Sequence, residues 1–266
     1  MTLYEAGQEP ARRESGEPMD YVEMLRDAWT FTRQGVFENV GRWIRLVLAI
    51  VLLAIPMNGY MMRIYRGAES APEVDQWGRL FVDGLKLIVV SFVYSIPILL
   101  VWVATYGAMM AGIFSGKMND AAISAWEPNM ALVALMYIVE FAIALLLPVV
   151  AIRFARSTRF SEAFNFRAIF DHIAKIGWLN YIIAVFLVAV LIAVPVMVLV
   201  FVFVLLAIGL AALTTFNLVA LLGLLAVAVL IFLILAPLIM VFQARYWTRL
   251  YDSAAVTDAA AATVTE

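Results

Sequence analysis

Residues 176–244 read IGWLNYIIAVFLVAVLIAVPVMVLVFVFVLLAIGLAALTTFNLVALLGLLAVAVLIFLILAPLIMVFQA, which is 69 consecutive positions without a charged side chain. A helix needs about 20 apolar residues to cross the hydrocarbon core of a bilayer. Two spans and one turn account for most of the stretch, and Thr214, Thr215 and Asn217 mark the turn. The stretch therefore predicts a membrane-embedded helical hairpin whose two ends lie on the same side.

The first half of this stretch, residues 178–213, is too long for one straight span. Pro195 and Gly209 allow a kinked helix, a tilted helix, or a span followed by an additional membrane-embedded piece. The residues alone do not choose among these three arrangements.

The composition of the whole chain also indicates an integral membrane protein. Of its 266 residues, 65% are hydrophobic and 14% are charged, and the mean hydropathy is +0.96. These values exclude a water-soluble domain of this length. The chain has no cysteine and one histidine, which excludes thiolate and multi-histidine metal sites. We expect no cofactor and no nucleic-acid partner.

Three apolar stretches end in the same way, with a proline followed by two arginines about one helical turn apart. They read Pro56…Arg63-x-x-Arg66, Pro148…Arg153-x-x-Arg156 and Pro237…Arg245-x-x-x-Arg249. Basic residues accumulate on the cytoplasmic side of a membrane. We therefore predict a multi-pass cell-membrane protein with a cytoplasmic C-terminus.

Residues 46–62 form the shortest apolar segment, with 17 uncharged positions between Arg45 and Arg63. A helix of this length spans about 25 Å, which is less than the ~30 Å hydrocarbon core. Pro56 lies inside the segment and favours a bend. We favour a crossing here. The alternative is a re-entrant hairpin, which would place all the flanking arginines on one side.

The chain is thus predicted to be an all-α helical bundle with about five transmembrane helices, the first of which crosses or re-enters. Two of the spans are predicted over residues 87–107 and 130–152. The membrane domain is expected to cover residues 21–251. Acidic composition predicts disordered tails over residues 1–20 and 252–266.

Amphipathic helices are predicted at the membrane surface, because apolar residues recur at intervals of three and four outside the spans. One covers residues 21–33, with Asp20 at the N-cap position. Two more follow the first two proline–arginine exits. Arg79…Asp83…Lys86 in the first copy matches Arg167…Asp171…Lys175 in the second. We infer a weak internal repeat.

Several motifs resemble those of a known family. They are Gly59-Tyr60-x-x-Arg63, Asp75-Gln-Trp-Gly78-Arg-Leu-Phe-Val-Asp83-Gly-Leu-Lys86, and Arg156-x-x-Arg159-Phe160-x-x-Ala163-Phe164. The sequence is similar here to the uncharacterised, mainly archaeal membrane family called domain of unknown function 4013. The resemblance extends over roughly residues 20–250. It implies a multi-pass membrane protein and brings no known activity, cofactor or catalytic residue.

Seven arginines near the predicted cytoplasmic helix ends are candidates for binding anionic lipid head groups, at about 1 kcal/mol per base, or a partner protein. They are Arg63, Arg66, Arg79, Arg153, Arg156, Arg159 and Arg167. Membrane topology alone also accounts for bases at these positions. The leading hypothesis is a non-enzymatic protein whose cytoplasmic face, which carries these arginines, engages anionic lipid head groups or a partner protein. A second copy of the chain and another membrane protein are the candidate partners.

Glu140 lies near the middle of a predicted span, where an ionised carboxylate costs at least about 2.5 kcal/mol. It is either the proton or cation site of a small transporter or channel, or a structural side chain. In the structural interpretation it forms hydrogen bonds with Ser91, Tyr94 or Ser95, which share one face of the preceding span.

Overall fold

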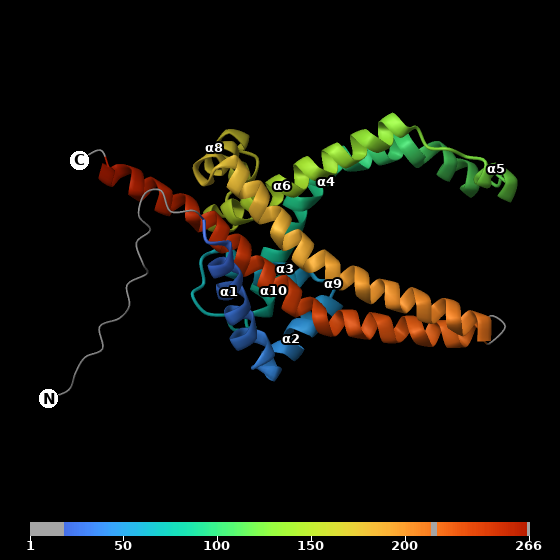
Figure 1. Cartoon of the computed structure of the whole chain (residues 1–266), viewed down its shortest axis with the longest axis horizontal. Helices are drawn as coiled ribbons and strands as arrows, with labels where there is room; N and C mark the ends of the chain where they lie inside the picture. The colour runs from blue at the N-terminus through green and yellow to red at the C-terminus, as the bar shows by residue number, and fades with distance from the viewer. Residues whose placement is uncertain (1–18, 214–216, 265–266) are drawn as a thin grey trace.

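A computed structural model describes residues 19–213 and 217–264, and all of its regular elements are helices (Figure 1). Four helices are long and apolar enough to cross a membrane: α4 (Trp77–Phe114), α6 (Met130–Ser157), α9 (Trp178–Leu213) and the Leu218–Ala255 part of α10 (Leu218–Val264). No strand occurs in the described ranges. The all-α prediction is confirmed, and the expected five spans become four.

Aspartate and asparagine side chains start many of the helices. The Asp20 carboxylate accepts a hydrogen bond from the Glu23 amide at 2.8 Å and begins α1 (Tyr21–Thr32), as predicted. Asparagines cap α2 (Val40–Val51), α5 (Asp120–Ser124), α6 and α8 (Phe166–Ile176) in the same manner: Asn39, Asn119, Asn129 and Asn165. The first amides of a helix have no partner within it, so these caps fix where each helix begins.

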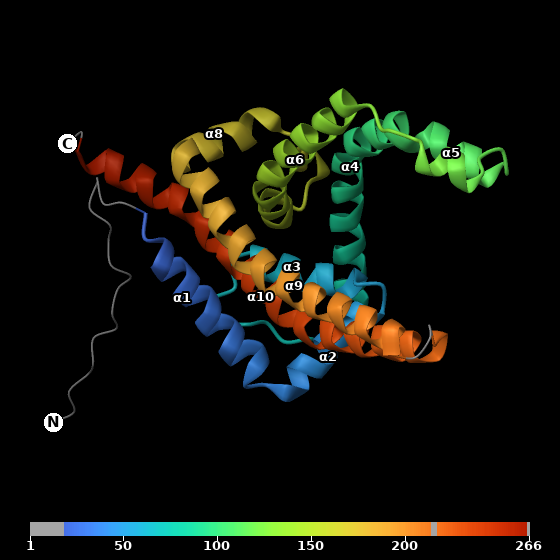
Figure 2. The ribbon, with the colours of Figure 1, turned by 45° about the vertical axis from the view of Figure 1, so that its right-hand side comes forward.

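The long helices form two hairpins that diverge from a shared core (Figures 1 and 2). One hairpin consists of α4 and α6, which α5 connects, and the other of α9 and α10. Their inner ends pack around α1, α3 (Ile55–Tyr65) and α8, where the largest buried side chains include Tyr60, Phe154 and Tyr246. Their outer halves expose apolar side chains, as expected of surfaces that face lipid. Figure 2 shows α4 bending between its ends, and Pro97 inside this helix accounts for the bend.

Residues 46–62 do not form one continuous helix. The short helices α2 and α3 are separated at residues 52–54, where Leu53 and Ala54 have positive φ angles of 60° and 57°. With 12 residues, α2 is about 18 Å long, and α3 is shorter still, so neither helix is long enough to cross a bilayer.

The two ends of this broken segment lie together. At its start, the Arg42 guanidinium pairs with the Glu73 carboxylate, and at its end Arg63 Nη1 donates to the Glu73 carbonyl at 2.7 Å. A continuous helix would hold residues 42 and 63 about 30 Å apart. The segment therefore turns back on itself, as in the hairpin alternative, and does not form the single continuous helix that a crossing would require.

The two last spans end and begin on either side of the predicted turn, at Leu213 and Leu218. α9 is continuous from Trp178 to Leu213 with Pro195 inside it, so it contains no additional membrane-embedded piece. Residues 214–216, including Thr214 and Thr215, lie outside the described residues. The Asn217 side chain then caps α10 by accepting from the Val219 amide at 3.0 Å.

α10 continues past residue 252, where the sequence predicts the start of a disordered tail. Asp252 lies within this helix and pairs with Arg156 at 2.7 Å, and Ala254 is buried in the core. The tail predicted at residues 1–20 falls almost entirely outside the described residues. The C-terminal helix thus contributes to the core at positions where the sequence predicts a disordered tail.

Aromatic donors from other helices bind the backbone beside two helix-internal prolines. A proline has no N–H and interrupts the hydrogen-bond ladder of its helix. The Tyr181 hydroxyl of α9 donates to the Leu145 carbonyl, three residues before Pro148 in α6. Trp43 Nε1 of α2 donates to the Ile234 carbonyl at 2.9 Å, three residues before the proline of α10. Both bonds lie next to a break in the ladder and join helices that are distant in sequence.

α3 and α4 approach so closely that only glycine fits between their backbones. A Cβ atom at Gly59 would lie 1.9 Å from the Leu80 carbonyl oxygen, and one at Gly84 would lie 1.8 Å from the Ile55 carbonyl oxygen. Each glycine thus faces the carbonyl located four residues before the other glycine. This reciprocal contact sets the distance between the turned-back segment and the first long helix.

Alanine at either glycine should force α3 and α4 apart. We expect Gly59→Ala and Gly84→Ala each to destabilise the protein by at least about 1–3 kcal/mol, the typical cost of overpacking. Thermal unfolding of the detergent-purified chain, followed by circular dichroism, measures the effect. Gly78→Ala is the control, because it lies on the same helix α4 and a Cβ there meets nothing within 4 Å. Equal melting temperatures for Gly78→Ala and Gly84→Ala would contradict the contact.

Candidate functional site

Most of the seven candidate arginines bind groups within the chain. Arg63 donates to Asp75 Oδ1 at 2.6 Å in addition to its bond with the Glu73 carbonyl, and Arg153 pairs with Glu162. These arginines therefore hold the loops that follow the helices from which they project.

Arg66 and Arg156 bind across the core in a reciprocal arrangement. Arg66 Nε donates to the Ala155 carbonyl at 3.1 Å, and Arg156 Nε donates to the Tyr65 carbonyl at 3.0 Å. Each guanidinium thus binds the carbonyl of the residue directly before the other arginine. Each also pairs with an aspartate, since Arg66 binds Asp83 at 2.8 Å just as Arg156 binds Asp252. The pair joins the ends of α3 and α6.

Arg159 and Arg167 differ from the other predicted arginines. Both are exposed, and neither guanidinium makes a hydrogen bond or ion pair with any residue that the structure describes. Arg79, by comparison, donates to the Gln76 side chain at 3.1 Å. Of the predicted set, Arg159 and Arg167 therefore remain available to an external anion.

Exposed aromatic side chains accompany these two arginines. The two arginines belong to a segment that comprises α7 (Phe160–Ala163) and α8. Within this segment, α8 packs on the core through buried isoleucines at positions 169, 173 and 176. Phe160, Phe166 and Phe170 are 43%, 49% and 43% exposed. Interleaved arginine and aromatic side chains suit the boundary between lipid head groups and acyl chains. We call residues 159–178 the basic–aromatic segment.

The polar cluster predicted around Glu140 is not formed. Glu140 is exposed on α6 and makes no hydrogen bond with any described residue. The Tyr94 hydroxyl instead donates to the Ala163 carbonyl at 2.7 Å, and Ser95 donates to the Phe92 carbonyl within its own helix. No interaction joins Ser91 to Glu140 in the described ranges. These residues do not converge on a common site.

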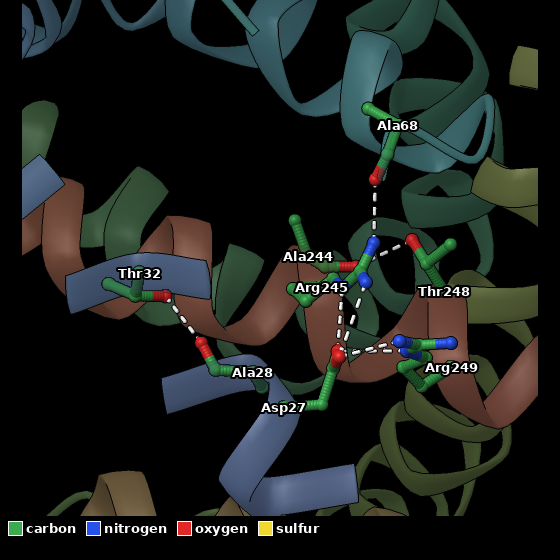
Figure 3. Close-up of polar contacts among 8 residues, drawn as sticks. All are labelled: Asp27, Ala28, Thr32, Ala68, Ala244, Arg245, Thr248 and Arg249. Carbon is green, nitrogen blue, oxygen red and sulfur yellow. Dashed lines mark hydrogen bonds and ion pairs between the residues drawn. The ribbon is translucent and has the colours of Figure 1, made fainter. Parts of the chain in front are cut away.

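The most buried charged group in the described core was not predicted. Figure 3 shows Asp27 of α1 facing Arg245 and Arg249 of α10. Arg245 Nε donates to Asp27 Oδ2 at 2.6 Å and Arg249 Nε to the same oxygen at 2.8 Å. Arg245 also donates to the Ala68 carbonyl at 2.6 Å, and its guanidinium lies 4.6 Å from the Phe31 ring centroid. The arginine thereby holds α1, α10 and the loop after α3 together.

The surroundings of Asp27 act on its pKa in opposite directions. Burial raises the pKa of the carboxyl, but the hydrogen bonds donated by Arg249 and Arg245 lower it more, to about 2. The sequence contains only a partial signal for this group. Arg245 and Arg249 are four residues apart and share a helix face, which indicates a common partner. The helical pattern of residues 21–33 puts Asp27 on the polar face of that helix, but the pattern does not identify Asp27 as that partner.

A polar cavity of about 260 Å³ borders this charged group. It is lined by Asp27, Thr30, Phe31, Gln34, Gly35, Arg42, Glu69, Ser70, Ala71 and Arg245. Among the lining residues, the two positive charges of the arginines balance the two negative charges of Asp27 and Glu69. Each arginine is already paired, Arg42 with Glu73 and Arg245 with Asp27. The described residues contain no group of three or more metal-ligating side chains. The cavity therefore has no surplus charge for an ionic ligand.

Comparison with protein families identifies the chain. A family model described as "Protein of unknown function (DUF4013)" matches residues 44–204, more than half of the chain. The chain belongs to this family. The resemblance seen in the sequence is thereby confirmed, over a narrower range than expected. The seven candidate arginines of this DUF4013 protein lie inside the matched range, whereas Asp27, Arg245 and Arg249 lie outside it. Comparisons with curated proteins and with solved structures gave no significant match.

Removing the Asp27 charge should leave a buried arginine without a counter-charge. We expect Asp27→Asn to destabilise the protein by about 3 kcal/mol, because the Arg245 side chain is only 8% exposed. Glu38→Gln is the matched control, since Glu38 pairs with Arg33 at a site where both side chains are about half exposed. Its effect should stay below about 1 kcal/mol. Thermal unfolding in detergent at pH 7 compares the two variants, and equal losses would contradict the structural role of Asp27.

The contribution of Asp27 should depend on pH. Its pKa in the folded state is about 2, below the ordinary value of 3.8, so protons bind more tightly to the unfolded chain. The stabilisation is therefore complete above about pH 4 and is lost as the pH falls toward 2. We expect the melting-temperature difference between wild type and Asp27→Asn to be constant from pH 7 to about 4 and then to shrink. A difference that stays constant down to pH 2 would contradict this assignment.

Proposed function

We propose that the protein is a non-enzymatic, multi-pass membrane protein whose basic–aromatic segment binds anionic lipid head groups at the cytoplasmic surface. The observation that carries the proposal is the pair Arg159 and Arg167, which are exposed, lack partners among the described residues, and lie among exposed phenylalanines. Near a membrane surface each such base contributes about 1 kcal/mol to binding anionic lipid. The phenylalanines add apolar contact with the acyl chains below.

The geometry supports lipid binding by these two arginines rather than by all seven. Four of the other arginines donate hydrogen bonds to carboxylates and backbone carbonyls of this chain: Arg63, Arg66, Arg153 and Arg156. A lipid phosphate would have to displace those internal bonds. The alternative of a transporter that uses Glu140 gains no comparable support, because Glu140 lines neither the polar cavity beside Asp27 nor the apolar cavity between α9 and α10.

The proposed topology has four crossings and one re-entrant segment formed by α2 and α3. It is supported by the contacts of Arg42 and Arg63 with Glu73, which bring the two ends of that segment together. The Asp27–Arg245 bond likewise brings α1 beside the last helix. With the hairpin turned back, every flanking arginine lies on one side, in agreement with the positive-inside rule. We assign that side, and the C-terminus, to the cytoplasm.

We also propose that the exits at α3 and α6 are copies of one unit. The reciprocal bonds of Arg66 and Arg156 support this, because the same arginine of each exit binds the carbonyl directly before the other arginine. Two copies related by an approximate two-fold axis would produce such an exchange. The copies then differ in their acidic partners, since Arg66 binds Asp83 of the following helix and Arg156 binds Asp252 of α10.

Neutralising the two free arginines should weaken anionic lipid binding without unfolding the protein. We expect the double variant Arg159→Gln/Arg167→Gln to retain about twenty- to thirtyfold less phosphatidylglycerol, at about fivefold per base. Native mass spectrometry of the protein released from nanodiscs of mixed phosphatidylglycerol and phosphatidylcholine counts the retained lipids.

Lys117→Gln is the control for a general change in charge. Lys117 lies beyond the outer end of α4, away from the basic–aromatic segment, so its neutralisation should lower the count of bound lipid by no more than about fivefold. If the double variant retains as much phosphatidylglycerol as Lys117→Gln, the proposed function is wrong. The melting temperatures of all variants should match that of the wild type, because neither arginine has an internal partner in the described ranges.

A further inference from the structure

Glu140 presents a carboxyl group on the outer surface of a membrane-spanning hairpin. It follows Met130, the start of α6, by about 15 Å of helix and precedes Arg153 by about 20 Å, so it lies deep in the hydrocarbon. Its side chain is exposed on the isolated chain. An ionisable side chain is rarely directed at lipid, where its hydrogen-bonding groups find no partner. Something outside this helix must therefore cover Glu140.

This chain does not itself supply the cover. The bases of the four long described helices lie toward the core end, at Arg79, Lys86, Arg153, Arg156, Arg245 and Arg249. Tyr94 and Ser95, on the facing helix, donate to backbone carbonyls instead. The α9–α10 hairpin diverges from the outer part of the α4–α6 hairpin, as Figure 1 shows. The partner of Glu140 must come from another molecule.

The chemistry of this face fits a second copy of the same chain. A protonated carboxyl group has one donor and one acceptor, so it is complementary to itself across a two-fold axis. Tyr137, three residues before Glu140 and 62% exposed, adds a second hydroxyl on the neighbouring part of the face. Ala134 and Ala144 beside them are exposed and small, which allows two helices to approach closely.

We propose that a second copy of this chain packs on the α6 face formed by Ala134, Tyr137, Glu140 and Ala144, with the two Glu140 carboxyl groups hydrogen-bonded to each other. The contact is isologous, so the same residues meet from both protomers near the two-fold axis. The proposal is independent of lipid binding by the basic–aromatic segment, which lies at the other end of the α4–α6 hairpin. The dimer covers the polar groups that a monomer would direct at lipid.

The absence of cysteine from the sequence allows a direct test of the interface. A single cysteine introduced by Ala144→Cys lies one helical turn from Glu140 and should form an intermolecular disulfide in liposomes under mild oxidation. Val198→Cys is the matched control, because Val198 is 58% exposed on α9 of the other hairpin. It should not cross-link. Equal cross-linking at both positions, or none at position 144, would overturn the proposal.

The role of the carboxyl group is measured separately. Full-length protein labelled with donor and acceptor dyes is reconstituted at increasing lipid dilution, and energy transfer gives the dimerisation constant. We expect Glu140→Leu to weaken dimerisation by about three- to thirtyfold, and Glu140→Gln, which keeps a donor and an acceptor, to remain close to wild type.

Other results of the dilution experiment count against the proposal. A wild-type protein that is monomeric at every dilution overturns it, as does a dimer unaffected by Glu140→Leu. Native mass spectrometry that finds a different protein or a lipid amine held in a Glu140-dependent manner assigns the face to another occupant and also overturns it. Because Glu140 is exposed and unpaired with any described residue, both variants should purify as folded protein with the wild-type melting temperature.

Discussion

Asp27 accepts hydrogen bonds from Arg245 and Arg249 and so fastens the first described helix to the last. Without this bond, α1 would have only its apolar face to hold it on α10, and the loop that Arg245 binds at Ala68 would lose its attachment. The buried charge of Arg245 is tolerated because the Asp27 carboxylate neutralises it and hydrogen bonds join the two side chains. The contacts of Asp27 and Arg245 thus hold together the core against which both hairpins pack.

Backbone carbonyls are the second recurrent constraint. Prolines and helix ends leave carbonyl oxygens without donors, and inside an apolar core these must be satisfied by side chains. Tyrosine and tryptophan donate from an apolar body, so they can bind such oxygens without burying a charge. The hydroxyl of buried Tyr246 likewise binds the Ala184 carbonyl within α9 at 3.0 Å, and Tyr181 and Trp43 bind carbonyls beside the prolines. These hydrogen bonds thereby join helices that are distant in the sequence.

Local signals in the sequence predicted what depends on local chemistry. The long helices follow from uninterrupted apolar runs, and the start of α1 follows from Asp20. Long-range pairing was not predictable, because periodicity assigns Asp27 to a polar face without naming what covers it. The turn within residues 46–62 was not predictable for a related reason. Their length was compatible with a short crossing, and only the shared partner Glu73 brings Arg42 and Arg63 together.

Positive charge at a membrane helix end is therefore a poor measure of lipid binding by itself. Topology requires bases on one side, and a chain that has them also has many exposed carbonyls and carboxylates close by. Arg66 and Arg156 illustrate the outcome, since each is held by a carbonyl and an aspartate of its own chain. An arginine is available to a phosphate only where the fold leaves it without such neighbours. In this chain the matching sequence patterns do not reveal that difference. Arg159 at the start of α7 and Arg167 on the exposed face of α8 have no internal acceptor among the described residues.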